Sequence, residues 1–132
     1  MQIKKRAAVL ASTMLLLGSL GALQAPTASA AVICTTQNAI TAKSTTLDGV
    51  HIELRYSTSW RCAWARITNA HVGDQVWLDQ SADSGKNWAT MEVNTVTSGT
   101  DAFTNPDPDK GIVSRACVWI RSSNHHKCTG AY

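Results

Sequence analysis

Hydrophobic and polar residues alternate along several stretches of the chain, which is the pattern of half-buried β-strands. In residues 50–56, Val, Ile, Leu and Tyr alternate with His, Glu and Arg. Residues 61–68 continue the alternation, with Cys62, Trp64 and Arg66 on one face and two alanines and an isoleucine on the other. Small residues opposite a tryptophan predict a central strand that a neighbour packs closely.

The same criteria predict a strand at 75–80, one or two strands within 88–97 and a final strand at 114–121. Gly, Asn, Asp and Ser separate these segments, and no apolar repeat at intervals of three and four residues indicates a helix. The longest predicted loop, 104–111, carries two prolines. We therefore expect an all-β fold, a small disulfide-stapled antiparallel sandwich or barrel.

The first 30 residues have the composition of an export signal. Basic residues near the start precede an apolar stretch, and a polar end carries the small-residue pattern Ala28-Ser29-Ala30. A membrane anchor is the alternative, but glycines interrupt a short apolar run and no basic stop-transfer cluster follows it. We expect a signal peptide at 1–30 and a secreted, extracellular single domain at 31–132.

Cleavage of this leader would change the charge of the chain. Three of the twelve Lys and Arg residues lie in the leader, so nine would remain against nine Asp and Glu residues. A formally neutral domain does not favour binding to nucleic acid or to an anionic membrane surface. We therefore expect no nucleic-acid partner, and no membrane association after cleavage.

The predicted domain contains four cysteines, which would compensate for a thin core: Cys34, Cys62, Cys117 and Cys128. An even number in an exported chain indicates two disulfides, for which three pairings exist. We favour Cys34 with Cys62, which fastens the new N-terminus to an internal strand, and Cys117 with Cys128, which closes the last hairpin. Zinc binding is the alternative, but no C-x-x-C pair is present, so we predict neither a metal site nor a cofactor.

Residues 81–88 have the form Ser-x-Asp-x-Gly-x-x-Trp, a pattern called an Asp-box. It is similar to turns in sialidases and in unrelated secreted β-proteins. Asp83 can accept backbone N–H bonds across the turn, Gly85 permits a positive φ, and Trp88 can pack beneath the loop. One copy in a short chain cannot build a propeller, so we interpret Ser81, Asp83, Gly85 and Trp88 as a structural turn and not as part of a glycosidase.

Acidic residues gather at 101–111, and within this stretch residues 107–111 (DPDKG) faintly resemble the start of a calcium loop. Val118 stands where the bidentate glutamate should be, so the match fails. We interpret Asp101, Asp107 and Asp109 as a solvated acidic loop, with calcium binding as the open alternative. The adjacent His125 and His126 would point to opposite faces of an extended segment and cannot easily hold one metal together.

No catalytic motif is apparent in the sequence. The serines lack a Gly-x-Ser-x-Gly elbow, and the cysteines are better used in disulfides. The residue types that a small secreted ribonuclease uses are present, but no motif joins them: Glu53, Arg55, Arg66, His71 and Arg115. We therefore predict no catalytic residues and keep a small secreted hydrolase as the weakest of three hypotheses.

Five tryptophans are many for a small domain with one phenylalanine and two tyrosines. We attribute Trp64, Trp88 and Trp119 to packing. Trp60, in a turn, and Trp77, on a strand face, are candidates for a binding surface, because indole combines apolar area with a hydrogen-bond donor. A two-layer fold with both faces partly covered is the equal alternative.

Residues 31–43 are polar and rich in threonine, and cleavage would make them an N-terminal arm tethered at Cys34. Such an arm can add as a strand to the exposed sheet edge of a partner protein. The alternative is that this segment pairs within its own sheet.

Residues 50–57 (VHIELRYS) and 61–67 (RCAWARI) resemble small bacterial proteins of the domain-of-unknown-function family 2690. The order Arg61-Cys62 departs from the Cys-Arg of the family pattern, so the chain resembles a divergent member, mainly over 34–73. The resemblance implies secretion from a Gram-positive bacterium and a compact β domain. It supplies no catalytic residues.

These observations favour a secreted, non-enzymatic protein-interaction domain. Such a domain could serve as an adaptor or accessory subunit of an extracellular assembly, for example an antibacterial toxin complex. Neutral charge, a stapled β fold, surplus tryptophan and an N-terminal arm support this hypothesis. A module that binds cell-wall glycan or another carbohydrate, with Trp60 and Trp77 as stacking platforms, is the alternative.

Overall fold

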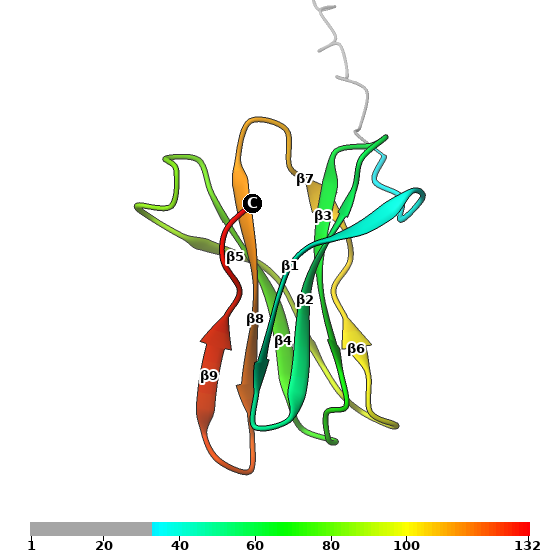
Figure 1. The fold of residues 1–132 in the computed structure, drawn as a ribbon, viewed down its shortest axis with the longest axis vertical. Helices are drawn as coiled ribbons and strands as arrows, with labels where there is room; N and C mark the ends of the chain where they lie inside the picture. Colours follow the sequence, from blue (N-terminus) through cyan, green and yellow to red (C-terminus); the bar gives the residue numbers. More distant parts are fainter. Residues whose placement is uncertain (1–32) are drawn as a thin grey trace, which may run out of the picture. The chain divides into compact units, whose positions relative to one another are not determined.

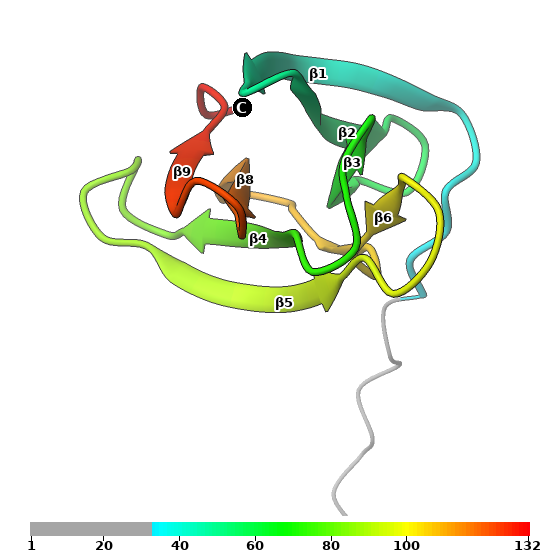
Figure 2. The same cartoon turned by 90° about the horizontal axis from the view of Figure 1, so that it is seen from below.

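The computed structural model describes residues 33–132, so the predicted signal peptide lies outside the described residues. The described chain folds into two antiparallel β-sheets that face one another (Figures 1 and 2). The all-β fold expected from the alternating pattern is confirmed, and it is a sandwich of two separate sheets. Within residues 33–132 no helix is long and apolar enough to cross a membrane.

Sheet A is built around β3 (Cys62–Thr68), which is central as its residue pattern predicts. Its order is β1 (Ala39–Leu47), β2 (Val50–Ser57), β3 and β6 (Ala102–Phe103), and β7 (Asp107–Pro108) also pairs with β3. Two of these strands, β6 and β7, are only two residues long and lie within the segment around the predicted loop.

Sheet B has the order β5-β4-β8-β9. It contains β4 (Gln75–Ser81), β5 (Ala89–Thr95), β8 (Val113–Ile120) and β9 (His125–Cys128). The first three correspond to strands predicted from the sequence, and β9 completes the last hairpin. Sheets A and B pack so that β1 lies beside β9 and β5 lies beside β6 (Figure 2).

Aliphatic side chains and alanines fill the space between the sheets, and no tryptophan belongs to this interior cluster. In β2, Val50, Ile52 and Leu54 face inward, which turns the polar residues between them outward. In β8, Ala116 and Val118 face inward, which places Trp119 on the outer face of sheet B. The tryptophans therefore lie outside the core between the sheets, and the sequence alone did not predict this placement.

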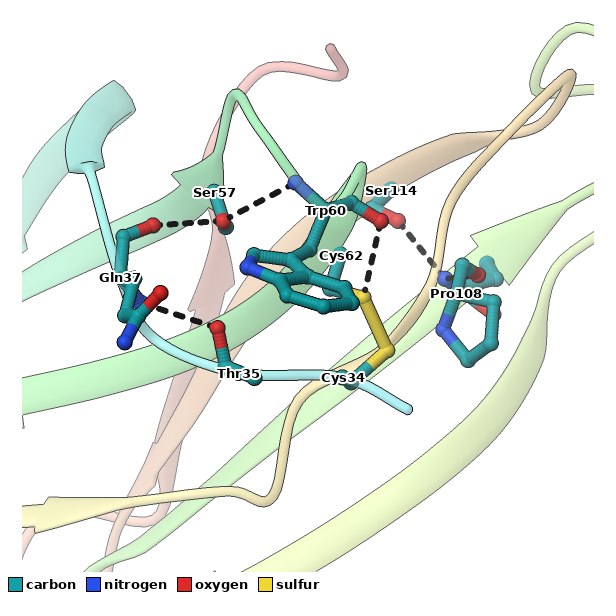
Figure 3. Close-up of a disulfide and its surroundings, with 9 residues drawn as sticks. Cys34, Thr35, Gln37, Ser57, Trp60, Cys62, Pro108 and Ser114 are labelled. Atoms are coloured by element: carbon teal, nitrogen blue, oxygen red, sulfur yellow. Dashed lines mark hydrogen bonds between the residues drawn. A yellow bond between two sulfur atoms is a disulfide. The ribbon is translucent and has the colours of Figure 1, made fainter. Parts of the chain in front are cut away.

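Two disulfides join Cys34 to Cys62 and Cys117 to Cys128, which is the pairing favoured from the sequence. The first bond ties the N-terminal segment to β3 (Figure 3). The second joins β8 to β9. From Ala39 onward this segment is β1, paired with β2. The structure thus places residues 39–43 of the predicted 31–43 arm within the domain's own sheet, which is the alternative stated above.

Candidate functional site

A cleft with a volume of about 440 Å³ opens on the outer face of sheet A. Arg55 lies opposite Trp64 in the β2–β3 pair, and Arg66 lies opposite Phe103 in the β3–β6 pair. Strand pairing therefore sets these four side chains side by side on one face. The complete lining is Thr36, Ala39, Arg55, Trp64, Arg66, Asp101 and Phe103.

Two of the residues that line the cleft are aromatic, Trp64 and Phe103. Trp64 is only 5% exposed although it lies outside the core cluster, so it opens only a small area to the cleft. Phe103 is 59% exposed. A covered indole beside an open phenyl ring offers an apolar anchor point of the kind found at protein interfaces.

The N-terminal segment forms one wall of the cleft through Thr36 and Ala39. The Cys34–Cys62 disulfide fixes this segment, and Ser57 Oγ donates a 2.6 Å hydrogen bond to the carbonyl oxygen of Gln37 (Figure 3). A wall anchored by a covalent bond on one side and by β1 on the other is preorganised, which lowers the entropic cost of binding.

Charged groups surround Glu53 at the centre of this face. Glu53 lies 3.3 Å from His51 Nε2, 3.7 Å from Arg55 Nη1 and 3.9 Å from Arg66 Nη1. Its Oε2 atom is buried and accepts no hydrogen bond. The side chain of Arg55 donates to Thr41 Oγ1, whereas the guanidinium of Arg66 makes no hydrogen bond to any described residue. The guanidinium of Arg66 therefore keeps its donors available to a ligand.

The two tryptophans predicted as a binding surface do not come together. Trp60 is 42% exposed and lies beside the Cys34–Cys62 disulfide at the end of sheet A (Figure 3). Trp77 is half-buried on the outer face of sheet B, opposite Val93 on one neighbouring strand and Cys117 on the other. They belong to different sheets, so they cannot act as one stacking platform.

A family model described as protein of unknown function, DUF2690, matches residues 24–106, which is more than half of the chain. The chain belongs to the DUF2690 family. The match extends beyond the stretch 34–73 that carries the sequence resemblance. Neither the comparison with curated proteins nor the comparison with solved structures finds a match. Every residue that lines the cleft lies within the part of this DUF2690 chain that the family model matches.

The Asp-box forms a tight turn between β4 and β5. Asp83 Oδ1 accepts hydrogen bonds from the backbone N–H groups of Lys86 and Asn87, and Ser81 Oγ accepts one from Gly85 N. Gly85 has a φ of +89°, and a Cβ atom at this position would lie 3.3 Å from the Trp88 ring. Hydrogen bonds from Ser81 and Asn87 lower the pKa of Asp83 to about 2. Turn formation thus uses the polar atoms of this motif.

Trp88 also packs against a charged pair on sheet B. The guanidinium of Arg115 lies 4.2 Å from the Trp88 ring centroid and contacts Asp79 through two nitrogens, at 2.9 and 3.0 Å. Asp79 is buried, and Thr90 Oγ1 donates a further hydrogen bond to it. These contacts satisfy a buried carboxylate and account for Arg115 by structure alone.

The five residues named as candidates for a small hydrolase do not converge. Glu53, Arg55 and Arg66 share the outer face of sheet A, but His71 lies beside Asp74 and Arg115 is bound to Asp79.

A second grouping of hydrolase residue types occurs where the turns of two hairpins meet. Ser123 Oγ and His125 Nδ1 both contact Asp48 Oδ2, at 2.6 and 2.9 Å. The carboxylate lies between the hydroxyl and the imidazole, so this arrangement does not present the serine to a histidine base.

Potential metal ligands converge at one place in the described residues: Asp79, Cys117 and Cys128. The two sulfurs form a disulfide and the carboxylate is paired with Arg115, so these groups are already used. Asp101, Asp107 and Asp109 do not form such a group.

The prediction of a solvated acidic loop is wrong for two of its three members. Asp107 is half-buried and its Oδ2 has no hydrogen-bond partner, and Asp109 is buried. Burial raises the pKa of Asp107, and the nearby charge of Glu92 raises it further. The cause is β7, which pairs with β3 and draws this segment onto the sheet.

Sequence reasoning missed Phe103 and Asp101 as parts of the cleft. In the DUF2690 chain, Ala102 is buried and Phe103 exposed, an alternation that marks a strand, but two residues are too few to be recognised as one. Phe103 is the only phenylalanine in the sequence, and its exposure becomes apparent only in the folded structure.

Proposed function

We propose that this DUF2690 protein is a secreted, non-enzymatic interaction domain that binds an extended segment of a partner protein in the cleft on sheet A. The observation that carries the proposal is the joint presence of Trp64, Arg55 and Arg66 in one preorganised hollow. Tryptophan and arginine are the residue types that most often dominate binding energy at protein interfaces. The export-type leader and the two disulfides support an extracellular location.

The lining of the cleft favours a particular partner chemistry. An apolar side chain would pack between Trp64 and Phe103, and a neighbouring Asp or Glu would accept hydrogen bonds from Arg66. Within residues 33–132 the guanidinium of Arg66 makes no hydrogen bond, and its contact with Glu53 at 3.9 Å is an ion pair only, so a partner carboxylate has that single interaction to displace. Asp101 at the same cleft disfavours a segment with several acidic residues in succession.

An adaptor needs a second point of attachment, and the N-terminal segment supplies a candidate. Ile33 is exposed immediately before the disulfide-bonded Cys34. A chain that leaves a covalently fixed point can engage a second partner without disturbing the fold. In this proposal the domain joins two components of an extracellular assembly.

The test is affinity capture of the tagged protein, residues 31–132, from the native culture supernatant, followed by mass spectrometry. Two cleft variants are compared with the unchanged protein: Arg66→Glu and Phe103→Ala. Two matched controls change exposed residues outside the cleft: Lys86→Glu and Val72→Ala. The proposal predicts that a stoichiometric partner is retained by the unchanged protein and by both controls and is lost from both cleft variants.

A second comparison separates the arm from the cleft. Deletion of residues 31–33 removes the segment ahead of Cys34 but leaves the disulfide and β1 intact. Loss of one partner on this deletion, with another retained, supports the adaptor role. A protein that runs alone and monomeric in the supernatant contradicts the interaction role, and a partner that both cleft variants retain contradicts the site.

A further inference from the structure

A second hollow of about 300 Å³ lies at the end of the sandwich where three connections meet, and we shall call it the end pocket. The connections are the β2–β3 turn with Arg61, the Asp-box turn with Ala82 and Ser84, and the β7–β8 segment with Asp109 (Figure 1). Loops gathered at one end of a sandwich are a common place for binding sites. We propose that the end pocket binds a neutral saccharide through Asp109 and Arg61.

Asp109 provides a fixed acceptor in the end pocket. Its side chain is 6% exposed, and Ser114 Oγ donates a 2.7 Å hydrogen bond to Oδ1. Gln80 Nε2 donates to Ser114 Oγ, and Asp109 N donates to the carbonyl oxygen of Arg61. These bonds hold the carboxylate in one orientation before any ligand arrives.

The second oxygen of Asp109 remains open to the end pocket. Within residues 33–132 no hydrogen-bond donor contacts Asp109 Oδ2. The fully buried side-chain atoms of these residues that lack a partner are Glu53 Oε2 and Asp107 Oδ2, so Asp109 Oδ2 is not fully buried. Asp109 Oδ2 is therefore accessible from the hollow that the residue lines. An oriented carboxylate with one oxygen free can accept hydrogen bonds from ligand hydroxyl groups.

The environment of Asp109 supports a binding role and not only a structural one. Burial raises the pKa of Asp109 to about 6, although the Ser114 hydrogen bond and the charge of Arg61 act in the opposite direction. A buried carboxylate with a raised pKa lowers the stability of the fold at neutral pH. Groups that are perturbed in this way occur most often at functional sites.

Charge selects the class of ligand. The end pocket contains the carboxylate of Asp109 and the guanidinium of Arg61, whose effects on a charged ligand oppose one another, so neither an anion nor a cation gains from the net charge of the pocket. A neutral ligand with neighbouring hydroxyl groups can donate to Asp109 and accept from Arg61 at the same time.

Aromatic rings complete the match. Tyr56 and Tyr132 line the same pocket, and their ring centroids lie 5.2 Å apart in an edge-to-face arrangement. The C–H face of a pyranose ring can pack against such a surface, as apolar ligand faces pack on aromatic pocket walls. The proposal concerns a different face from the cleft on sheet A, so either site can fail without the other.

The test is a titration of the ¹⁵N-labelled protein, residues 31–132, followed by the chemical shifts of its backbone amides. The probes are methyl β-glucopyranoside, methyl α-mannopyranoside and N-acetylglucosamine, with acetate and methylammonium as charged comparisons. We expect saturable shifts at Ser84, Asp109 and Gly111 with at least one sugar and none with either ion. Shifts produced by an ion instead of by the sugars, or no saturable shift at these amides, would overturn the proposal.

Variants tie the response to the named groups. Asp109→Asn keeps the shape and the Ser114 contact but removes the charged acceptor, and Ala82→Trp fills the mouth of the end pocket without touching the carboxylate. Both should lower the sugar affinity at least tenfold. Asp101→Asn, which removes an exposed carboxylate from the cleft on sheet A, should leave it unchanged. Equal sugar affinity in the unchanged protein and in all three variants would contradict the assignment of the site to the end pocket.

Discussion

Glu53 Oε2 lies 3.9 Å from Arg66 Nη1, within the range of an ion pair but too far for a hydrogen bond. The same oxygen lies 3.7 Å from Arg55 Nη1, and it is buried without any hydrogen-bond partner. Glu53 therefore holds two guanidinium groups by charge alone, on the face that carries the cleft. An incoming carboxylate would compete with Glu53 for both.

The competition predicts the effect of Glu53→Gln. Loss of this internal anion leaves Arg55 and Arg66 with uncompensated charge, so the affinity for an acidic partner segment should rise several-fold. The measurement is a titration of the captured partner against both proteins at low and high salt, because the gain should shrink as ionic strength screens the charges. Glu92→Gln, away from the cleft, is the control, and an equal gain in that variant would show that only net charge matters.

The two disulfides should contribute unequally to stability. In the chain-entropy model, Cys34–Cys62, which spans 28 residues, contributes about 3.5 kcal/mol, and Cys117–Cys128, which spans 11, about 3 kcal/mol. We expect the double variant Cys34→Ser/Cys62→Ser to lower the free energy of unfolding by about this amount and also to weaken partner binding, because it releases the cleft wall. Cys117→Ser/Cys128→Ser should lower stability without changing affinity. Denaturant titration measures the first effect, and unchanged binding in both variants would argue against the anchored wall.

The Asp-box turn predicts a difference between two glycines with positive φ. Ala at Gly85 would place its Cβ 3.3 Å from the Trp88 ring, whereas Ala at Gly99 meets nothing within 4 Å. Both substitutions should cost about 1–2 kcal/mol for the left-handed backbone, and Gly85→Ala should cost about 1 kcal/mol more because the ring must shift. Thermal unfolding of the two variants checks this. Equal losses would mean that Trp88 does not pack under the turn.

Stability should depend on pH through Asp109. Its pKa of about 6 in the folded protein exceeds the ordinary value of 3.8, so the folded state binds this proton more tightly than the unfolded state. Stability linked to the group is therefore fully present below pH 3.8 and is lost as the pH rises through about 6. Asp109→Asn should raise the free energy of unfolding by up to about 3 kcal/mol at pH 8, and by much less at pH 4. Urea unfolding at both pH values measures the difference, and a gain that is the same at both would contradict the burial of an ionised carboxylate.

The long strands could be predicted from the sequence because alternation is visible over seven or eight residues. Val50–Ser57 and Val113–Ile120 each bury every second side chain over much of their length. This alternate burial produces the alternation of hydrophobic and polar residues from which the strands were predicted. The disulfide pairing also followed from position, since Cys117 and Cys128 flank one hairpin.

Ala39–Leu47 was missed as a strand because its outward positions and much of its inward face are small or polar. An edge strand buries little, so its sequence carries little periodicity.

The cleft could not be predicted, because Phe103 reaches Arg66 only through a strand pairing between residues 37 positions apart in the chain. Asp109 was misjudged for a similar reason: its burial depends on β7 joining β3, a contact that no local pattern encodes.

The most direct test of the central claim is site-specific photo-crosslinking in the native culture supernatant. A benzophenone amino acid would replace Phe103 in one protein and Val93, on the outer face of sheet B, in a control. Both residues are exposed, so both replacements should fold. We predict that irradiation joins a single partner protein to position 103 and none to position 93. A partner joined to position 93 alone, or no crosslink from position 103, would contradict binding in the cleft on sheet A.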